Sequence, residues 1–231
     1  NLTSAGSNDI FVIKLDVNGN LAWAHSFGTA SNDVGREIAV DANGVAYVAG
    51  FFYNTVDFDP GPGVANVSSN GAADAFLLKL DWNGNYVGAW NFGSGGNDDA
   101  ADIEIDASGN MYLSGYFTGS VDFDPGIGVQ TLVSNGSADA FVVKLSNIGQ
   151  YEWAINMGGT STDDAQEISL DGQGNVIVSG FFYNTADFDP GIGIQNLTSN
   201  GSGDFYIAKY DPTGQYIWAH GFGSNLNDAA W

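Results

Sequence analysis

The residues best suited to chemistry in this sequence are pairs of aspartates in a short motif that occurs three times. The motif reads VDFDPG at 56–61 and at 121–126, and ADFDPG at 186–191. Side chains alternate between the two sides of an extended strand, so the phenylalanine can anchor the loop while both carboxylates point away from it. The carboxylates belong to Asp57, Asp59, Asp122, Asp124, Asp187 and Asp189.

Two carboxylates side by side repel each other unless a cation, hydrogen-bond donors or a proton relieves the repulsion. Ca²⁺ takes roughly 6–8 oxygen ligands, which carboxylates, loop carbonyls and water can supply together. These six aspartates are therefore candidate Ca²⁺ ligands, two in each loop. A second interpretation stays open, in which each aspartate caps a turn by accepting backbone N–H groups. The dense Asp-x-Asp-x-Asp-Gly pattern of well-characterised calcium loops is absent, which favours the turn caps.

Four of the five basic residues occupy one position in each repeat: Lys14, Lys79, Lys144 and Lys209. A catalytic lysine would need a pocket particular to one site, so this recurrence predicts a structural role. We expect each lysine to form an ion pair or to donate to a neighbouring carbonyl. The acids expected as partners are Glu37, Asp102 and Glu167.

No catalytic constellation stands out from the repeat. His25 and His220 occupy equivalent positions, where other repeats have Trp90 and Ile155, so packing explains them better than catalysis or zinc binding. The sequence has no phosphate-binding glycine loop, zinc-ligand spacing or nucleophile elbow. Trp82 lies in a turn and is the tryptophan that we expect to be exposed. We expect no catalytic residue and no enzyme activity.

A period of 65 residues positions all of these side chains, as the spacing from Asp57 to Asp122 and from Asp122 to Asp187 shows. Each period contains two hairpins with tight turns. In the first copy, one hairpin pairs 11–15 with 21–27 and the other pairs 36–41 with 45–52. Four short strands in each repeat, with no segment long enough for a helix, predict an all-β chain of four-stranded antiparallel propeller blades.

The expected strand order fixes the domain boundaries. We expect IAVD to be the innermost strand, then VAYVAG, then FVIKL, with the tryptophan-containing strand outermost. An outer half-blade then occupies 1–28, blades follow at 33–93, 98–158 and 163–223, and a fifth element begins at 228–231. These are about 3.6 units, fewer than the roughly 4–8 blades of a closed propeller. Residues 1–231 are therefore predicted to be a single repeat array that belongs to a larger propeller.

The same strand order predicts that the links between blades and the long links from second to third strand share one face. That face would collect Asp33, Asp98 and Asp163, the DFDPG pairs, and Asp74 with its copies. Each long link runs about twenty residues, and loops of that length usually carry function or an extra strand. The alternation in GVQTLVSNG at 128–136 predicts such a strand.

The run NDVGREIAVDANGVAYVAGFF at 32–52, its copies, and DAFVVKL followed by a tryptophan-containing strand resemble the SBBP type of β-propeller repeat. The resemblance covers essentially the whole chain. It implies a module of large secreted or surface-attached bacterial proteins, and it supplies no catalytic motif.

The charge narrows the choice of partners. The chain has 27 acidic residues against five lysines and arginines, a net charge of −22, so nucleic acid and anionic membranes are poor partners. Cysteine is absent, which excludes disulfides and thiolate metal sites. No apolar run approaches the roughly 18 residues that suggest a membrane span, so we expect no membrane insertion.

These observations predict a non-enzymatic extracellular module with a structural or adhesion role, with Ca²⁺ as the candidate cofactor. A glycan-binding or protein-binding propeller is the alternative, and a hydrolase is the least favoured class. Exposed strand edges at either end would favour self-association or pairing with further blades outside this chain.

Overall fold

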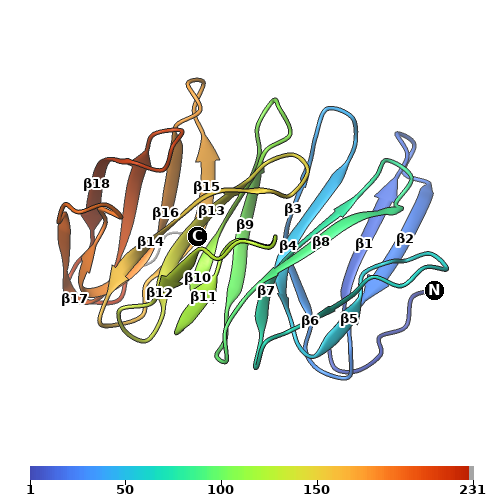
Figure 1. The fold of residues 1–231 in the computed structure, drawn as a ribbon, viewed down its shortest axis with the longest axis horizontal. Coiled ribbons are helices and arrows are strands. Elements are labelled where there is room, and N and C mark those ends of the chain that lie inside the picture. The colour runs from blue at the N-terminus through green and yellow to red at the C-terminus, as the bar shows by residue number, and fades with distance from the viewer. Residues whose placement is uncertain (229–231) are drawn as a thin grey trace.

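In a computed structural model, residues 1–228 are described and form β-strands joined by turns and loops (Figure 1). None of these residues forms a helix long and apolar enough to cross a membrane. The predicted all-β class is confirmed over this range. The fifth element predicted at 228–231 lies outside the described residues, apart from Asp228.

The strands fall into four groups along the chain, which we call the first to fourth units. The first unit contains β1 (Ile10–Leu15) and β2 (Leu21–Phe27). The second contains β3 (Val34–Val40), β4 (Ala46–Phe52), β5 (Thr55–Asp57), β6 (Asn66–Ser68), β7 (Asp74–Leu80) and β8 (Tyr86–Phe92). The third contains β9 (Asp99–Ile105), β10 (Met111–Phe117), β11 (Ser120–Asp122), β12 (Thr131–Val133), β13 (Asp139–Leu145) and β14 (Tyr151–Gly159). The fourth contains β15 (Asp164–Leu170), β16 (Val176–Asp187), β17 (Asn196–Tyr210) and β18 (Tyr216–Phe222).

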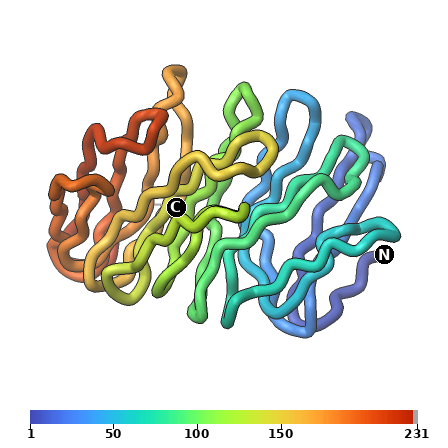
Figure 2. The backbone as a smooth tube through the Cα atoms, viewed as in Figure 1, coloured from blue at the N-terminus to red at the C-terminus, as the bar shows by residue number. Residues whose placement is uncertain are grey.

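The strands pair antiparallel within each unit, and the second long strand pairs with the third across the short strands of the link. In the second unit they form a sheet in the order β3-β4-β7-β8. The third and fourth units share one eight-stranded sheet, because Gly158 and Gly159 at the end of β14 pair with β16. Figures 1 and 2 show the units side by side in chain order, with the first and fourth at opposite ends of an open array. This arrangement is propeller-like.

Three apolar clusters fill the spaces between successive units. Between the first two units, Ile10 and Val12 of β1 join a cluster with Phe76 and Leu78 of β7. The next two clusters join the second unit to the third and the third to the fourth. Fully burying a side chain such as phenylalanine stabilises a fold by roughly 1.5–3 kcal/mol, so the contacts between units are a main source of stability.

The long links carry additional strands. The alternation at 128–136 was predicted to form a strand, and it does so as β12, which pairs with β11. The second unit has the equivalent pair β5–β6. In the fourth unit the same pairing extends β16 and β17, where Thr185 lies opposite Thr198. Each link is therefore a small hairpin, and its DFDPG motif begins where the first strand of that hairpin ends.

Candidate cation site in the DFDPG loops

A buried phenylalanine holds each DFDPG loop against the core. Phe58 is 0% exposed, and its ring centroid lies 5.2 Å from that of Phe76. The flanking carboxylates behave differently, since Asp57 is exposed and Asp59 is half-buried. The phenylalanines at the equivalent positions, also buried, are Phe123 and Phe188. The predicted separation of an apolar anchor from two outward carboxylates is confirmed.

Both carboxylates in each loop accept backbone N–H groups. Oδ1 of Asp57 accepts from Asp59 at 3.1 Å and from Ala65 at 2.8 Å. Oδ1 of Asp59 accepts from Gly61 at 2.7 Å. The same contacts recur at Asp122, Asp124, Asp187 and Asp189. The turn-cap contacts are thus present in all three copies.

The second oxygen of each carboxylate is the part left for a ligand. Oδ2 of Asp57 and Oδ2 of Asp59 accept no hydrogen bond from residues 1–228. Oδ2 of Asp59 lies over Gly63, where a Cβ atom would collide with it. No group of three or more His, Cys, Asp or Glu side chains in the described part of the chain could hold a metal ion. Each loop therefore leaves one carboxylate oxygen of each aspartate without a hydrogen bond, and a hard cation bound there would need carbonyls and water to complete its shell.

A second set of aspartates lies buried where successive units join. Asp98 is 1% exposed, and it accepts the N–H of Thr118 at 2.6 Å and the N–H of Ser94 at 2.7 Å. It therefore ties the residues that follow β8 to those that follow β10. The equivalents Asp33 and Asp163 also accept two backbone N–H groups each. Burial raises the pKa of Asp98 and that of Asp163 to about 6.

Asp98 and Asp163 each have an equally buried neighbour at the start of the third strand, Asp74 and Asp139 respectively. Oδ2 of Asp74 accepts from the backbone of Asn70 and the amide of Asn91, both at 3.0 Å, while Oδ1 has no partner among the described residues. Burial raises the pKa of Asp74, and its charge adds to the rise at Asp98. Equally unpartnered oxygens occur at Asp9, Asp139 and Asp204.

The expectation that the junction aspartates and Asp74 would share a face is consistent with this proximity. Their burial was not predicted. The glycine that recurs near the end of the outer strand could have indicated this burial, because a Cβ atom at Gly93 would collide with the Asp74 carboxylate. The equivalent glycines are Gly28, Gly158 and Gly223.

The lysines confirm one expectation and correct another. Lys14 donates to the carbonyl of Trp82 at 2.8 Å, and Lys79 donates to the carbonyl of Asn147 at 2.7 Å, so each links its unit to the next. The other two lysines form ion pairs: Lys144 with Glu152 at 2.9 Å, and Lys209 with Asp171 at 2.8 Å. The prediction that the lysines pair with Glu37, Asp102 and Glu167 was wrong. The lysines contact turn residues and an acid of the outer strand instead.

Arg36, the fifth basic residue, does not occupy the position that the four lysines share. It contacts a cluster of buried aspartates instead. Its Nη2 lies 2.6 Å from Oδ2 of Asp99 in the following unit. The equivalent of Asp99 in the fourth unit is Asp164, which is 5% exposed. Burial raises the pKa of Asp164 to about 7, and the negative charge of Asp99 contributes. This cluster was not predicted, because Arg36 occurs in one unit and breaks the repeat.

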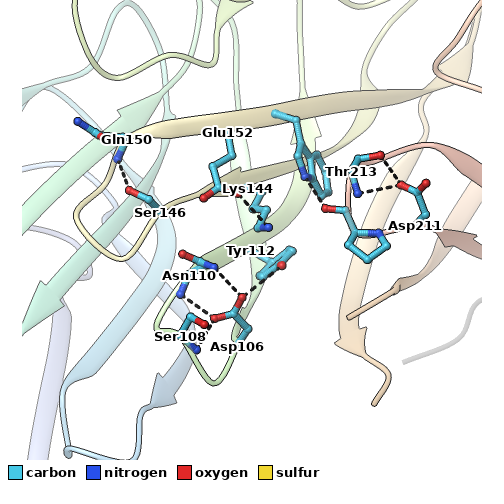
Figure 3. Close-up of polar contacts among 12 residues, drawn as sticks. Asp106, Ser108, Asn110, Tyr112, Lys144, Ser146, Gln150, Glu152, Asp211 and Thr213 are labelled. Atoms are coloured by element: carbon cyan, nitrogen blue, oxygen red, sulfur yellow. Dashed lines mark hydrogen bonds and ion pairs between the residues drawn. The ribbon is translucent and has the colours of Figure 1, made fainter. Parts of the chain in front are cut away.

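The hairpin turns form a separate set of loops from the DFDPG links. Their aspartates act as turn caps (Figure 3). Asp106 accepts the N–H of Ser108 at 2.8 Å and that of Asn110 at 2.9 Å. Where serine replaces the first aspartate of the turn, the hydroxyl of Ser146 accepts from the N–H of Gln150 at 3.1 Å. The substitution therefore preserves the turn.

Trp82 lies in a hairpin turn, at a position where the other turns have no tryptophan. It is 59% exposed as expected, and Nζ of Lys14 lies 2.9 Å from its ring centroid. Trp82, Trp23, Lys14 and Asp16 line a groove of about 450 Å³. His25 stacks on Trp23 with ring centroids 5.1 Å apart, and burial lowers its pKa, which agrees with a packing role.

No protein-family model matches the chain. It is 23% identical over 224 residues to an uncharacterized WD repeat-containing protein of Acanthamoeba polyphaga mimivirus, covering 86% of this chain and 16% of that protein. It is 25% identical over 184 residues to the regulatory protein FlaEY of Caulobacter vibrioides, covering 75% of this chain and 18% of that protein. The chain thus spans less than a fifth of the length of these relatives.

Among solved structures, a protein of unknown function from Bacteroides caccae aligns with 98% of this chain and 94% of its own. Its identity is 11% and its TM-score is 0.30. The similarity to a WD repeat-containing protein and the all-β array agree on a propeller-like repeat fold. The narrower SBBP resemblance stays a prediction.

Proposed function

We propose that this chain is a non-enzymatic β-propeller module of a larger bacterial secreted or surface protein, where it acts as a structural or adhesion element. The observation that carries the proposal is that the DFDPG carboxylates make the same backbone contacts in all three copies. An enzyme would concentrate unusual residues around one pocket, whereas these residues recur with the architecture.

The proposal includes four-stranded blades of 65 residues. The sheet order β3-β4-β7-β8 supports it, since the innermost, second, third and outermost strands follow one another in the expected sequence. The third and fourth units repeat this pairing within their shared sheet. A relative with a WD-repeat description supports the same architecture.

We also propose that the DFDPG loops bind Ca²⁺ and that the bound cation stiffens the module outside the cell. Each loop offers Oδ2 of two aspartates, and the net charge of −22 attracts cations to the surface. The backbone contacts at Oδ1 hold both carboxylates in position, so a cation would meet a partly ordered site. Such binding would raise the stability of the folded state.

Thermal melts in EDTA, in Ca²⁺ and in Mg²⁺ test this proposal. Ligand at about 100 times its dissociation constant adds about 2.7 kcal/mol for each site, so the midpoint should rise in Ca²⁺ and keep rising with its concentration. The combined substitution of Asp57, Asp122 and Asp187 by asparagine should abolish that rise. A matched control replaces the turn caps Asp16, Asp81 and Asp211 by asparagine and should keep it.

Identical melts in EDTA and in Ca²⁺ would leave the loop aspartates as turn caps alone. A hydrolase activity that a single aspartate substitution abolishes would contradict the non-enzymatic proposal itself.

A glycan is the second candidate ligand, favoured by the groove beside Trp82. The exposed indole, with Nζ of Lys14 over its ring and Asp16 in the same groove, offers a sugar both aromatic and polar contacts. We expect a bound sugar to change tryptophan fluorescence and Trp82→Ala to remove the change. Ile127→Ala, at an exposed loop residue of the third unit, is the control. A glycan panel without any signal would dismiss this candidate.

A further inference from the structure

A pocket of about 500 Å³ lies between the second and third units, where their hairpin turns meet. Its walls come from the turn between β3 and β4, the turn between β9 and β10, and the turn between β13 and β14, with Tyr47 and Lys79 from β4 and β7. Both units have a neighbouring unit on each side, so these walls are internal to the array. Pockets of roughly 300–1,000 Å³ hold small ligands in many proteins.

Asp41, in the turn between β3 and β4, lacks a contact that its equivalents make. In the third unit the side-chain amide of Asn110 donates to Oδ2 of Asp106 at 2.8 Å (Figure 3). The fourth unit repeats this contact, between Asn175 and Asp171. The second unit has Val45 in place of the asparagine, so within residues 1–228 Oδ2 of Asp41 accepts only the hydroxyl of Tyr47, at 3.4 Å. Asp41 therefore lines the pocket with an oxygen whose hydrogen-bonding capacity is largely unused.

Lys79 likewise lacks the acidic partner of its equivalent in the next unit. Lys144 pairs with Glu152 at 2.9 Å, whereas the second unit has Val87 at the position of that glutamate. Lys79 forms no ion pair within residues 1–228, and its Nζ donates to the carbonyl of Asn147 at 2.7 Å. An ammonium group has three N–H donors, so two remain for a ligand. Burial lowers the pKa of the half-buried Lys79, so an acceptor from a ligand would stabilise its charged form.

Aliphatic side chains complete the lining. Val40 and Ile148 are 62% and 69% exposed, and the half-buried Val45 and Ile105 also line the pocket. Ile148 is a further departure from the repeat, because the first two units have asparagine at its position in the turn. The pocket therefore combines an unused carboxylate oxygen and two ammonium donors with apolar side chains, in an arrangement that the other units do not repeat.

We propose that this pocket binds a neutral monosaccharide, either free or as the terminal residue of a glycan. One hydroxyl of the sugar would donate to Oδ2 of Asp41 while another accepts from Nζ of Lys79, and a C–H face of the ring would pack on Ile148. A neutral ligand is favoured because an anion would meet Asp41 and Asp106, and a cation would meet Lys79. The residues that line this pocket differ from those that line the groove beside Trp82. Sugar binding here goes beyond the proposed structural role and needs no Ca²⁺.

Isothermal titration calorimetry on the full chain in EDTA tests the proposal, with D-glucose, D-galactose, D-mannose and N-acetyl-D-glucosamine as probes. We expect at least one of these sugars to bind saturably. Val45→Asn and Val87→Glu give Asp41 and Lys79 the partners that their equivalents have, so each substitution should weaken binding by at least about tenfold. Both variants should fold, because the third unit carries the same two residue types at these positions.

Lys144→Met is the matched control, since it removes the equivalent lysine of the third unit, and Trp82→Ala removes the other candidate sugar surface. Both should bind the same sugar as the wild type does, and thermal melts check that all four variants fold. The proposal is overturned if no sugar binds, if Val45→Asn and Val87→Glu bind as tightly as the wild type, or if Trp82→Ala abolishes binding. Stronger binding of acetate or methylammonium than of any sugar would also overturn it, since the pocket would then select a charged group. Because EDTA removes Ca²⁺, none of these outcomes bears on the loop aspartates, so the two proposals can fail separately.

Discussion

The loop aspartates and the junction aspartates accept the same kind of hydrogen bond in very different surroundings. Asp57 is exposed and bonds within its own loop, whereas Asp98 is 1% exposed and joins segments that follow two different strands. Burial raises the pKa of Asp98 to about 6. The two sets share residue type, repeat spacing and the kind of hydrogen bond, and they differ in burial, from which we expect the junction aspartates to contribute more to stability.

Replacing the junction carboxylate should have the largest effect. Asp98→Ala leaves the N–H groups of Ser94 and Thr118 without their acceptor, and a buried unsatisfied group costs about 1–3 kcal/mol. We expect a loss of about 2–4 kcal/mol in the free energy of unfolding, measured with urea in EDTA. Asp57→Ala, whose donors can turn to water, should lose less than about 1.5 kcal/mol. A larger loss at Asp57 than at Asp98 would reverse the comparison.

The buried carboxylates should also set the pH dependence. The pKa of Asp98 and that of Asp163 are about 6 in the folded chain and near 3.8 when unfolded. The folded state therefore holds more protons between pH 4 and pH 6, and the free energy of unfolding falls as pH rises through that window. Asp164, with a pKa of about 7, extends the window upward.

We expect the midpoint of thermal unfolding to be at least about 4 °C higher at pH 5 than at pH 8. Asp163→Asn should make the dependence shallower, because it removes one of the titrating groups. The half-buried turn cap Asp171 has a lowered pKa, so its contribution is lost only at more acidic pH. A midpoint that is flat or rises between pH 5 and pH 8 would show that these carboxylates are not protonated in the folded state.

A methyl group beside the unpartnered carboxylate should have a smaller effect. The Cβ of Gly93→Ala would collide with the Asp74 carboxylate, and forcing extra atoms into a packed site costs about 1–3 kcal/mol. Gly95→Ala is the matched control, because its Cβ would meet nothing within 4 Å. Urea unfolding compares the two variants directly. Equal stabilities would mean that the Asp74 carboxylate can move away without loss.

The lysine contacts between units should matter least. Lys14→Met removes the hydrogen bond to the carbonyl of Trp82 but keeps most of the apolar stem, so we expect a loss of about 0.5–1.5 kcal/mol. Lys209→Met, which breaks an ion pair within one unit, should lose less than about 1 kcal/mol. The same urea series measures both variants, and a loss above that of Asp98→Ala would contradict this ranking.

The repeat made much of this arrangement predictable. The alternation around Phe58 indicated a buried ring between outward carboxylates, and the pattern at 128–136 indicated β12. Neither inference needed tertiary information, because both follow from the two-residue period of a strand. The turn positions were equally predictable, because the tight turns that join the strands of each hairpin could be located from the sequence alone.

Features that depend on the next unit could not be predicted in this way. Asp98 and Asp57 recur with the same period, so the sequence could not separate a buried carboxylate from an exposed one. In the first unit Trp23 and Lys14 both donate to the carbonyl of Trp82. In the third unit the indole of Trp153 makes the equivalent bond to the carbonyl of Pro212, whereas Lys144 pairs with Glu152 instead. The partner that each lysine takes depends on the packing of its unit, which the repeat alone does not specify.

The most direct test combines both sets of aspartates in one experiment: urea unfolding in EDTA and in saturating Ca²⁺. The account predicts that Asp98→Ala loses the same free energy of unfolding in both buffers. The combined Asp57, Asp122 and Asp187 substitution to asparagine should lose little in EDTA and should fail to gain stability in Ca²⁺. If the combined variant gains as much stability in Ca²⁺ as the wild type does, the loops hold no cation, and the division between a stabilising set and a cation-binding set is wrong.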